Sequence, residues 1–159
     1  MKILYLDFDG VLHDEAVYYH PKRGIYIQTP NRVLFEWMPI LEKLLARHPE
    51  VKIVLSTSWV RVKSFNFAKQ HLSAPLQERV IGATYHRRLM RRAWFESLPR
   101  GEQIVQDVVR RVPTSWFAID DDSRYWPPEF RDNLIETDGH LGISDPNIQS
   151  AIRETLERF

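Results

Sequence analysis

Three short, mostly apolar runs in this chain end directly in carboxylates or hydroxyls, and this pattern constrains the fold more than any other feature. Short apolar runs of strand-forming residues are typical of buried parallel strands. The runs and the polar residues after them are 2–6 with Asp7, Asp9 and Gly10, 51–55 with Ser56, Thr57 and Ser58, and 116–119 with Asp120, Asp121 and Asp122. Helical patterns separate the runs, so we predict an α/β protein with a mainly parallel central sheet. Ligands of such sheets bind beyond the carboxyl ends of the strands, where these polar groups would collect.

The segments between these runs supply the predicted helices and one hairpin. Residues 24–28 are expected to pair with residues 17–19 as a hairpin arm or flap, a kind of loop that often covers an active site. Apolar residues recur at helical spacing from Arg32 to Arg47, so we predict a helix there, with Asn31 as its cap and a kink or break at Pro39. The other predicted elements are helices over 60–70, 76–78, 102–111 and 147–157 and a strand over 79–81 that Gly82 closes.

Composition limits the size, partners and location of the protein. A chain of 159 residues with 43% hydrophobic side chains can bury one core without cross-links, so we predict a single domain over residues 1–159. The 22 basic and 21 acidic side chains nearly cancel, so no overall field attracts the chain to nucleic acid or to a membrane. The absence of cysteine excludes disulfides and thiolate metal sites and favours a reducing compartment, with the cytoplasm as the default. The first apolar run is too short for a signal peptide or a membrane span.

The two aspartates after the first run, Asp7 and Asp9, are expected to act together. Residues i and i+2 of an extended chain point to the same side, about 7 Å apart, so both carboxylates would face one pocket. Two like charges this close favour a bound divalent cation or a proton kept by one of them. All the available ligands are hard oxygens, so we predict Mg²⁺, held by Asp7 and Asp9 with Asp120 and Asp121 from a neighbouring strand.

The same residues suit phosphoryl-transfer chemistry. An aspartate can act as a covalent nucleophile, and a second aspartate can serve as general acid and base. Gly10 would let the chain turn sharply beside the substrate, with no side chain to block its approach. The pattern therefore favours an enzyme whose reacting groups all follow strand ends.

Several strings, taken in chain order, resemble the haloacid dehalogenase superfamily of phosphatases and phosphotransferases. The segment DFDGV at residues 7–11 looks like its first motif, Ser56 like its second, and Asp120-Asp121 like its fourth. The strings DFDGVLH, VLSTSW, RVIGAT, RGEQI and WFAIDDD are similar to the branch found as a domain in Swiss Army knife RNA-repair proteins. The resemblance spans residues 2–122 and implies a three-layer, Rossmann-like fold.

The resemblance also implies a role for each motif residue. Asp7 would attack phosphorus, and Asp9 would protonate the leaving oxygen and then activate water. Ser56 would position the phosphoryl group, with Thr57 as the alternative by one residue. The third motif is usually a lysine or an arginine, and we assign it to Arg100, which opens a helical stretch and would offset charge on the phosphoryl oxygens. Four other arginines compete for this assignment: Arg87, Arg88, Arg91 and Arg92.

Relatives carry cap domains after the first motif or between the second and third, and neither gap here is long enough for a large cap. About 46 residues separate Asp9 from Ser56 and about 43 separate Ser56 from Arg100, and the predicted flap and helices use them. An uncapped site suits an extended substrate such as a phosphorylated RNA or DNA end. Eight arginines between residues 79 and 111 could hold phosphates, although such a stretch is more often a solvated helix face.

Three other functions stay open at this point. The chain could be a phosphatase of nucleotides or sugar phosphates, with residues 11–32 as a lid that sets specificity. It could be a phosphorylation-dependent signalling receiver, although the acceptor aspartate of receivers follows a middle strand of the chain, whereas Asp7 follows the first. It could also be an inactive domain that binds phosphorylated RNA or a repair partner.

Overall fold

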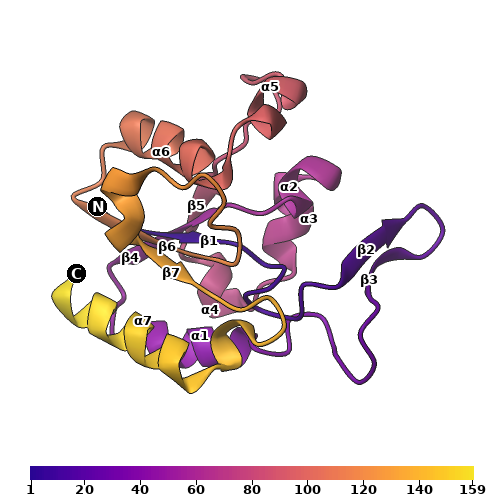
Figure 1. Ribbon diagram of the computed structural model, residues 1–159, viewed down its shortest axis with the longest axis horizontal. Coiled ribbons are helices and arrows are strands. Elements are labelled where there is room, and N and C mark those ends of the chain that lie inside the picture. Colours follow the sequence, from indigo (N-terminus) through magenta and orange to yellow (C-terminus); the bar gives the residue numbers. More distant parts are fainter.

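The computed structural model describes residues 1–159 and has a five-stranded sheet at its centre (Figure 1). The strands are β1 (Lys2–Leu6), β4 (Val51–Leu55), β5 (Val80–Ala83), β6 (Ser115–Asp120) and β7 (Leu134–Glu136). Their spatial order is β5-β4-β1-β6-β7, and all neighbours pair in parallel. β1 lies between β4 and β6, so the three runs predicted as strands form the middle of the sheet.

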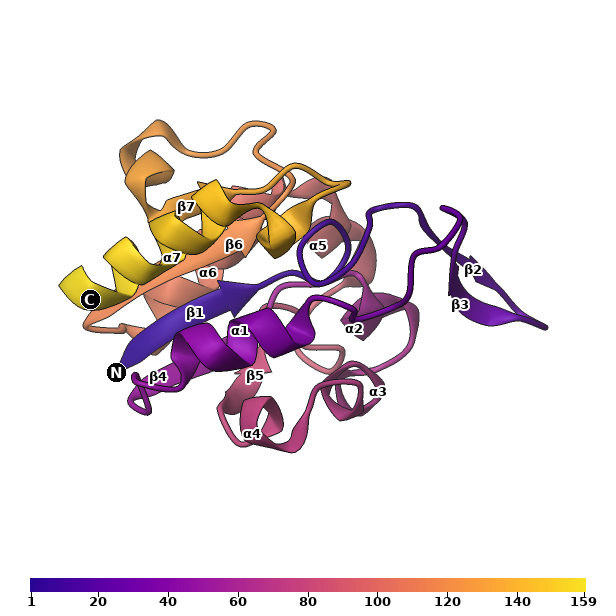
Figure 2. The ribbon, with the colours of Figure 1, turned by 90° about the horizontal axis from the view of Figure 1, so that it is seen from below.

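Helices cover both faces of the sheet and give the expected three-layer architecture (Figure 2). The longest are α1 (Met38–Leu45), α6 (Arg100–Arg111) and α7 (Pro146–Arg158). Successive side chains of a strand point to opposite faces, so Leu4 packs in the larger core cluster with Leu41 of α1, whereas Ile3 packs with Ile104 of α6. Burial on both faces explains the continuous apolar sequence of β1, since each such side chain contributes about 1.5–3 kcal/mol when it leaves water.

The helix predicted from Arg32 begins only at Met38, and Asn31 is not its cap. Asn31 and Phe35 have φ angles of 62° and 60°, which lie in the left-handed region and cannot continue a helix. Proline has no N–H and is tolerated in the first turn of a helix, and α1 places Pro39 there. The break expected at Pro39 is therefore the start of the helix.

The helix predicted over residues 60–70 is divided into α2 (Trp59–Val62) and α3 (Phe65–Gln70). Lys63 leaves the helical region at the end of α2, and the Ser64 hydroxyl caps α3 by accepting a hydrogen bond from the Phe67 N–H (3.0 Å). The remaining helical elements are α4 (Ala74–Gln77), α5 (Arg92–Ser97) and the 3₁₀ helices η1 (Pro128–Asn133) and η2 (Gly142–Ser144). Elements this short show too little periodicity to be predicted, and α5, η1, η2 and β7 were missed for that reason.

The later helices and β5 lie close to their predicted positions. α7 begins after Asp145, whose carboxylate caps it by accepting a hydrogen bond from the Asn147 N–H (2.9 Å). β5 covers Val80–Ala83, so Gly82 lies inside the strand and does not close it. A Cβ at Gly82 would meet the end of the Arg111 guanidinium, so a larger residue there requires that side chain to shift.

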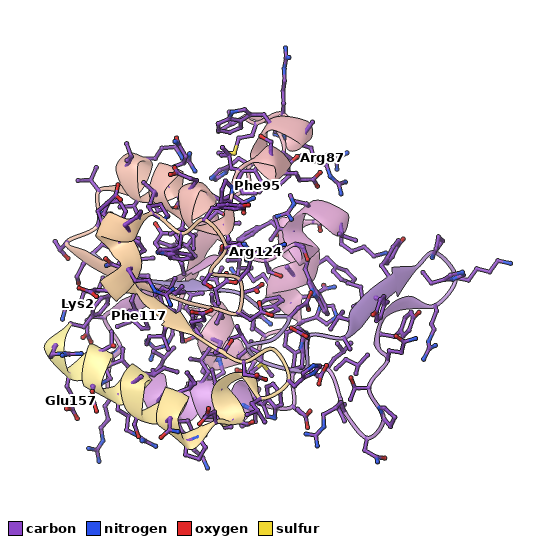
Figure 3. The ribbon with its side chains drawn as sticks, viewed as in Figure 1. Lys2, Arg87, Phe95, Phe117, Arg124 and Glu157 are labelled. Atoms are coloured by element: carbon purple, nitrogen blue, oxygen red, sulfur yellow. The ribbon has the colours of Figure 1, made fainter.

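The predicted hairpin is present as β2 (Val17–His20) and β3 (Gly24–Ile27), paired antiparallel. It stands away from the sheet at the carboxyl end of β1 (Figures 1 and 2), and no large cap domain is inserted anywhere in the chain. Figure 3 shows Lys2 and Glu157 at the opposite end, near the two termini. None of the helices has the length and apolar character needed to cross a membrane.

Candidate active site

Three carboxylates converge at the carboxyl edge of β1 and β6. Asp7 follows β1, Asp120 ends β6, and Asp121 is the next residue; one oxygen from each lies within 4.8 Å of the others. Asp7 and Asp120 are buried, and Asp121 is half-buried. The register pairs Leu6 with Ile119, so the residues that follow these two strand positions lie side by side, as expected from a parallel sheet.

Arg100, the first residue of α6, joins this carboxylate cluster from the helix layer. Its Nη1 lies 2.9 Å from Asp120 Oδ2 and 3.4 Å from Asp7 Oδ1, and it also donates to the Ser56 carbonyl. Of the five arginines considered for the third motif, Arg100 is the one that the fold brings to the carboxylates. Arg92 instead pairs with Glu96 (2.7 Å), and the other three arginines, Arg87, Arg88 and Arg91, are exposed.

The cluster carries more negative charge than its one guanidinium offsets. Burial raises the pKa of the Asp7 and Asp120 carboxyls, although Arg100 opposes the shift. Burial and the nearby Asp7 raise the pKa of Asp121 to about 8. Burial alone would lower the pKa of Arg100, but Asp120 and Asp7 reverse the effect and hold it above its ordinary value. A divalent cation would relieve this excess of negative charge.

The donor set of the cluster fits Mg²⁺. Asp7 Oδ1 accepts from the Phe8 N–H (2.8 Å) and Asp120 Oδ1 from the Asp122 N–H (2.9 Å). Asp7 Oδ2 and both carboxylate oxygens of Asp121 accept no hydrogen bond from another residue. Hard carboxylate oxygens without protein donors are ligands that Mg²⁺ prefers, and no histidine or cysteine competes within this cluster.

Asp9 lies apart from the three carboxylates, in a hydrogen-bond network of its own. Asp9 Oδ1 is 2.8 Å from His13 Nε2 and accepts a hydrogen bond from Trp59 Nε1 (2.9 Å). His13 is fully buried, and its Nδ1 accepts from the Phe35 N–H (3.1 Å), so the proton of a neutral ring lies on Nε2 and is donated to Asp9. The sequence assigned Asp9 to the metal with the other three, but the structure groups only Asp7, Asp120 and Asp121.

The hydroxyls after β4 have different surroundings. Ser56 is buried, and its Oγ lies 3.5 Å from Arg100 Nη1, beside the carboxylates. Thr57 Oγ1 accepts a hydrogen bond from the Trp59 N–H (3.3 Å) and so supports the start of α2. Ser58, to which the sequence gave no role, lines the open cavity. The geometry thus favours Ser56 over Thr57 as the hydroxyl nearest the cluster.

An open cavity of about 450 Å³ lies over the cluster. It is lined by Asp7, Asp9, Glu15, Ala16, Tyr18, Ser58, Arg100, Asp121 and His140. The loop residue His140 reaches the chain near the hairpin, with Nδ1 3.1 Å from Asp14 Oδ2 and Nε2 3.5 Å from Glu15 Oε1. Glu15 and Tyr18 belong to the segment that the sequence predicted as a flap or lid, whereas His140 gave no signal, because only folding brings a residue so distant in the chain to this site.

Gly10 has the conformation and the space that only glycine tolerates. Its φ is +75°, and an added Cβ would overlap the Asp121 carboxylate. Gly24 has φ +78° with nothing near an added Cβ, so it provides a matched control. We expect Gly24→Ala to cost about 1 kcal/mol of unfolding free energy in urea and Gly10→Ala at least about 1 kcal/mol more. Equal costs would show that Gly10 is required for its φ angle alone.

The arginines between residues 79 and 111 do not form one binding surface. Arg79 donates to three backbone carbonyls between the end of α1 and the first residue of β4, and Arg110 and Arg111 both pair with the buried Asp107. Figure 3 shows Arg87 beside α5, where Phe95 packs toward the body. The interpretation of these arginines as mostly structural or solvated side chains therefore fits the structure better than a phosphate-binding surface does.

The parallel strand order and the aspartates after β1 and β6 are those of the haloacid dehalogenase (HAD) class of α/β proteins, as the sequence motifs implied. The chain belongs to the family described as the HAD domain in Swiss Army Knife RNA repair proteins, whose family model matches residues 3–148. A search of curated proteins and a search of solved structures each gave no significant match.

Proposed function

We propose that this protein is a Mg²⁺-dependent phosphatase that hydrolyses phosphate monoesters at RNA ends through an aspartyl-phosphate on Asp7. One observation carries the proposal: Asp7 Oδ1 is held by the Phe8 N–H and faces Arg100, whereas Oδ2 has no donor and Asp7 lines the open cavity. A carboxylate fixed through one oxygen with the other oxygen free is suited to attack phosphorus.

The proposed first step forms the Asp7 Oδ2–phosphorus bond and breaks the bond from phosphorus to the leaving oxygen. Asp9, in its protonated form, gives its proton to that oxygen. Arg100, 3.4 Å from Asp7 Oδ1, would stabilise charge on the phosphoryl oxygens, with the Ser56 hydroxyl 3.5 Å from its Nη1 as a second donor in this proposal. In the second step Asp9 takes a proton from water, the water attacks phosphorus, and phosphate leaves with Asp7 restored.

The residues that would hold Mg²⁺ are Asp7, Asp120 and Asp121. The bound ion would neutralise charge on the phosphoryl group and hold its oxygens for in-line attack. Asp9 Oδ1 already makes hydrogen bonds with His13 and Trp59. We therefore propose that the Asp9 side chain serves acid–base chemistry and does not bind the metal. This refines the four-carboxylate set expected from the sequence.

RNA ends are the proposed substrate because of the family and the open site. The family description refers to RNA repair proteins, and the absence of a large cap leaves the cavity accessible to an extended chain. A small-molecule phosphatase is the second candidate, because Tyr18 of the hairpin lines the same cavity and a hairpin over a site can select small esters.

The two hydrogen bonds to Asp9 predict a role for Trp59 as a positioning residue. Trp59→Phe keeps a buried aromatic ring but removes the N–H that donates to Asp9 (2.9 Å). Without this N–H the Asp9 carboxyl is no longer held within reach of the leaving oxygen, and a displacement of about 1 Å can cost about 10²-fold, so we expect kcat to fall about tenfold or more while KM changes little. Trp126→Phe removes a comparable N–H bond, to the Phe130 carbonyl (3.0 Å), and should leave kcat near wild type. Equal losses in both variants would contradict the role.

The proposed function is tested by Mg²⁺-dependent phosphate release from 3′- and 5′-phosphorylated oligonucleotides, nucleotides and sugar phosphates, with Asp7→Asn as the control. Release from oligonucleotide ends supports the RNA-end phosphatase. Turnover of small esters alone supports the second candidate. Binding of phosphorylated RNA without hydrolysis would contradict the proposed phosphatase activity and support a role as a binding module.

A further inference from the structure

A second cavity, of about 280 Å³, adjoins the site on the hairpin side. It is lined by Asp9, Val17, Tyr18, Tyr19, Ile25, Ser58, Trp59 and Val62. It shares Asp9, Tyr18 and Ser58 with the cavity over the carboxylates, so the two spaces meet at Asp9. The first cavity is lined mainly by polar groups, whereas six of the eight residues around the second are apolar or aromatic.

The hairpin register explains the apolar wall of this second cavity. Tyr19 pairs directly with Ile25, and paired residues of an antiparallel ladder point to the same face. That face lies toward Trp59 and Val62 of α2, and Figures 1 and 2 show the hairpin beyond α2. Tyr19 is 47% exposed and Val62 39%, so the cavity opens to solvent and has no protein occupant.

The proposed chemistry determines which part of a substrate would reach this cavity. The general acid must lie within hydrogen-bond reach of the leaving oxygen, so the group attached to that oxygen lies on the Asp9 side of the phosphorus. That side opens into the apolar cavity. The phosphate would therefore occupy the polar cavity, and the group attached to the leaving oxygen would occupy the apolar cavity.

We propose that the second cavity binds the nucleobase of the nucleotide that carries the phosphate; this proposal rests on the proposed function and names the substrate group that the site recognises. Tyr19 of the hairpin and Trp59 of α2 line it as aromatic residues, and Tyr19, which is 47% exposed, offers the accessible ring; aromatic rings hold bases by stacking without regard to sequence. The volume suits one ring system, and the opening lets a chain continue outward. Lys63 Nζ lies 4.7 Å from the Tyr19 ring centroid at the edge of this space, where it would attract the next phosphate.

The test compares an RNA trinucleotide with a terminal phosphate, at the end that the enzyme prefers, with the same trinucleotide whose terminal residue is abasic. Stacking of one base on an aromatic side chain corresponds to about a 5- to 160-fold effect. We expect Tyr19→Ala to lower kcat/KM for the base-containing substrate by about tenfold, through KM, and to leave the abasic substrate unchanged. Tyr19→Phe should restore the wild-type values. Adenosine 5′-monophosphate and ribose 5-phosphate repeat the comparison for free nucleotides.

Trp94→Ala is the matched control, because Trp94 has the same 47% exposure as Tyr19 and lines neither cavity. Equal kcat/KM for base-containing and abasic substrates in the wild type would overturn the base site while the phosphatase stands. Calorimetric titration of adenosine 5′-monophosphate into Asp7→Asn protein separates the two proposals. Binding that Tyr19→Ala weakens supports the base site even without turnover, and an absence of both binding and turnover overturns it.

Discussion

Replacing Asp7 with asparagine is expected to lower phosphate release by at least about 10³-fold, the scale of losing a catalytic nucleophile. The amide has the shape of the carboxylate, and its oxygen can still accept the Phe8 N–H bond (2.8 Å), so the fold should persist. Attack on phosphorus requires the second carboxylate oxygen, which the amide nitrogen replaces. Steady-state phosphate release and circular dichroism, measured together, check both parts.

Asp122→Asn provides the matched control for this prediction. Asp122 follows Asp120 and Asp121, but its side chain pairs with Arg124 (3.0 Å) and lies outside the three-carboxylate group. Activity near wild type is expected for this variant. Rapid acid quenching of the wild-type reaction should also recover phosphate covalently attached to the peptide that contains Asp7. Wild-type turnover in Asp7→Asn would exclude Asp7 as the nucleophile.

The parts of the site that follow strand ends were predictable from the sequence. Apolar runs identify buried strands, and parallel strands place the residues after them at one edge. This reasoning predicts that Asp7, Ser56 and Asp120 lie close together at that edge. Among five arginines the sequence favours Arg100 because it opens a helical stretch before the fourth motif, and it is the one whose guanidinium reaches Asp120 (2.9 Å).

The surroundings of Asp9 were not predictable, because they depend on contacts between distant segments. Trp59 lies fifty positions from Asp9 and reaches it through the hydrogen bond from its Nε1 to Asp9 Oδ1. The orientation of His13 depends on the Phe35 N–H, which is presented by a residue with φ of 60°. No periodic pattern encodes such a turn, and the same turn explains why α1 begins later than predicted.

The metal-free protein is expected to lose stability as pH rises from about 4 to about 8. Burial raises the pKa of Asp121 from its ordinary value of 3.8 to about 8 and also raises that of Asp7 and Asp120. Between these values the folded state binds more protons than the unfolded state, so the free energy of unfolding falls with rising pH. Thermal unfolding in the presence of a chelator, measured at pH 5 and pH 8, checks the direction.

Mg²⁺ should reverse this loss of stability. Asp121→Asn should distinguish the effect of the carboxylate charge on stability from the effect of Mg²⁺ binding. A ligand at a hundred times its Kd stabilises by about 2.7 kcal/mol, so the wild-type Tm at pH 8 should rise by several degrees on addition of Mg²⁺. Asp121→Asn removes one of the crowded charges, so its metal-free Tm at pH 8 should exceed that of the wild type by about 3 °C or more, and Mg²⁺ should add little. Asp122→Asn should retain the full response to Mg²⁺. A wild-type Tm that Mg²⁺ does not change would contradict binding of the cation at this site. Arg100 would then be the one group that offsets the charge of the three carboxylates.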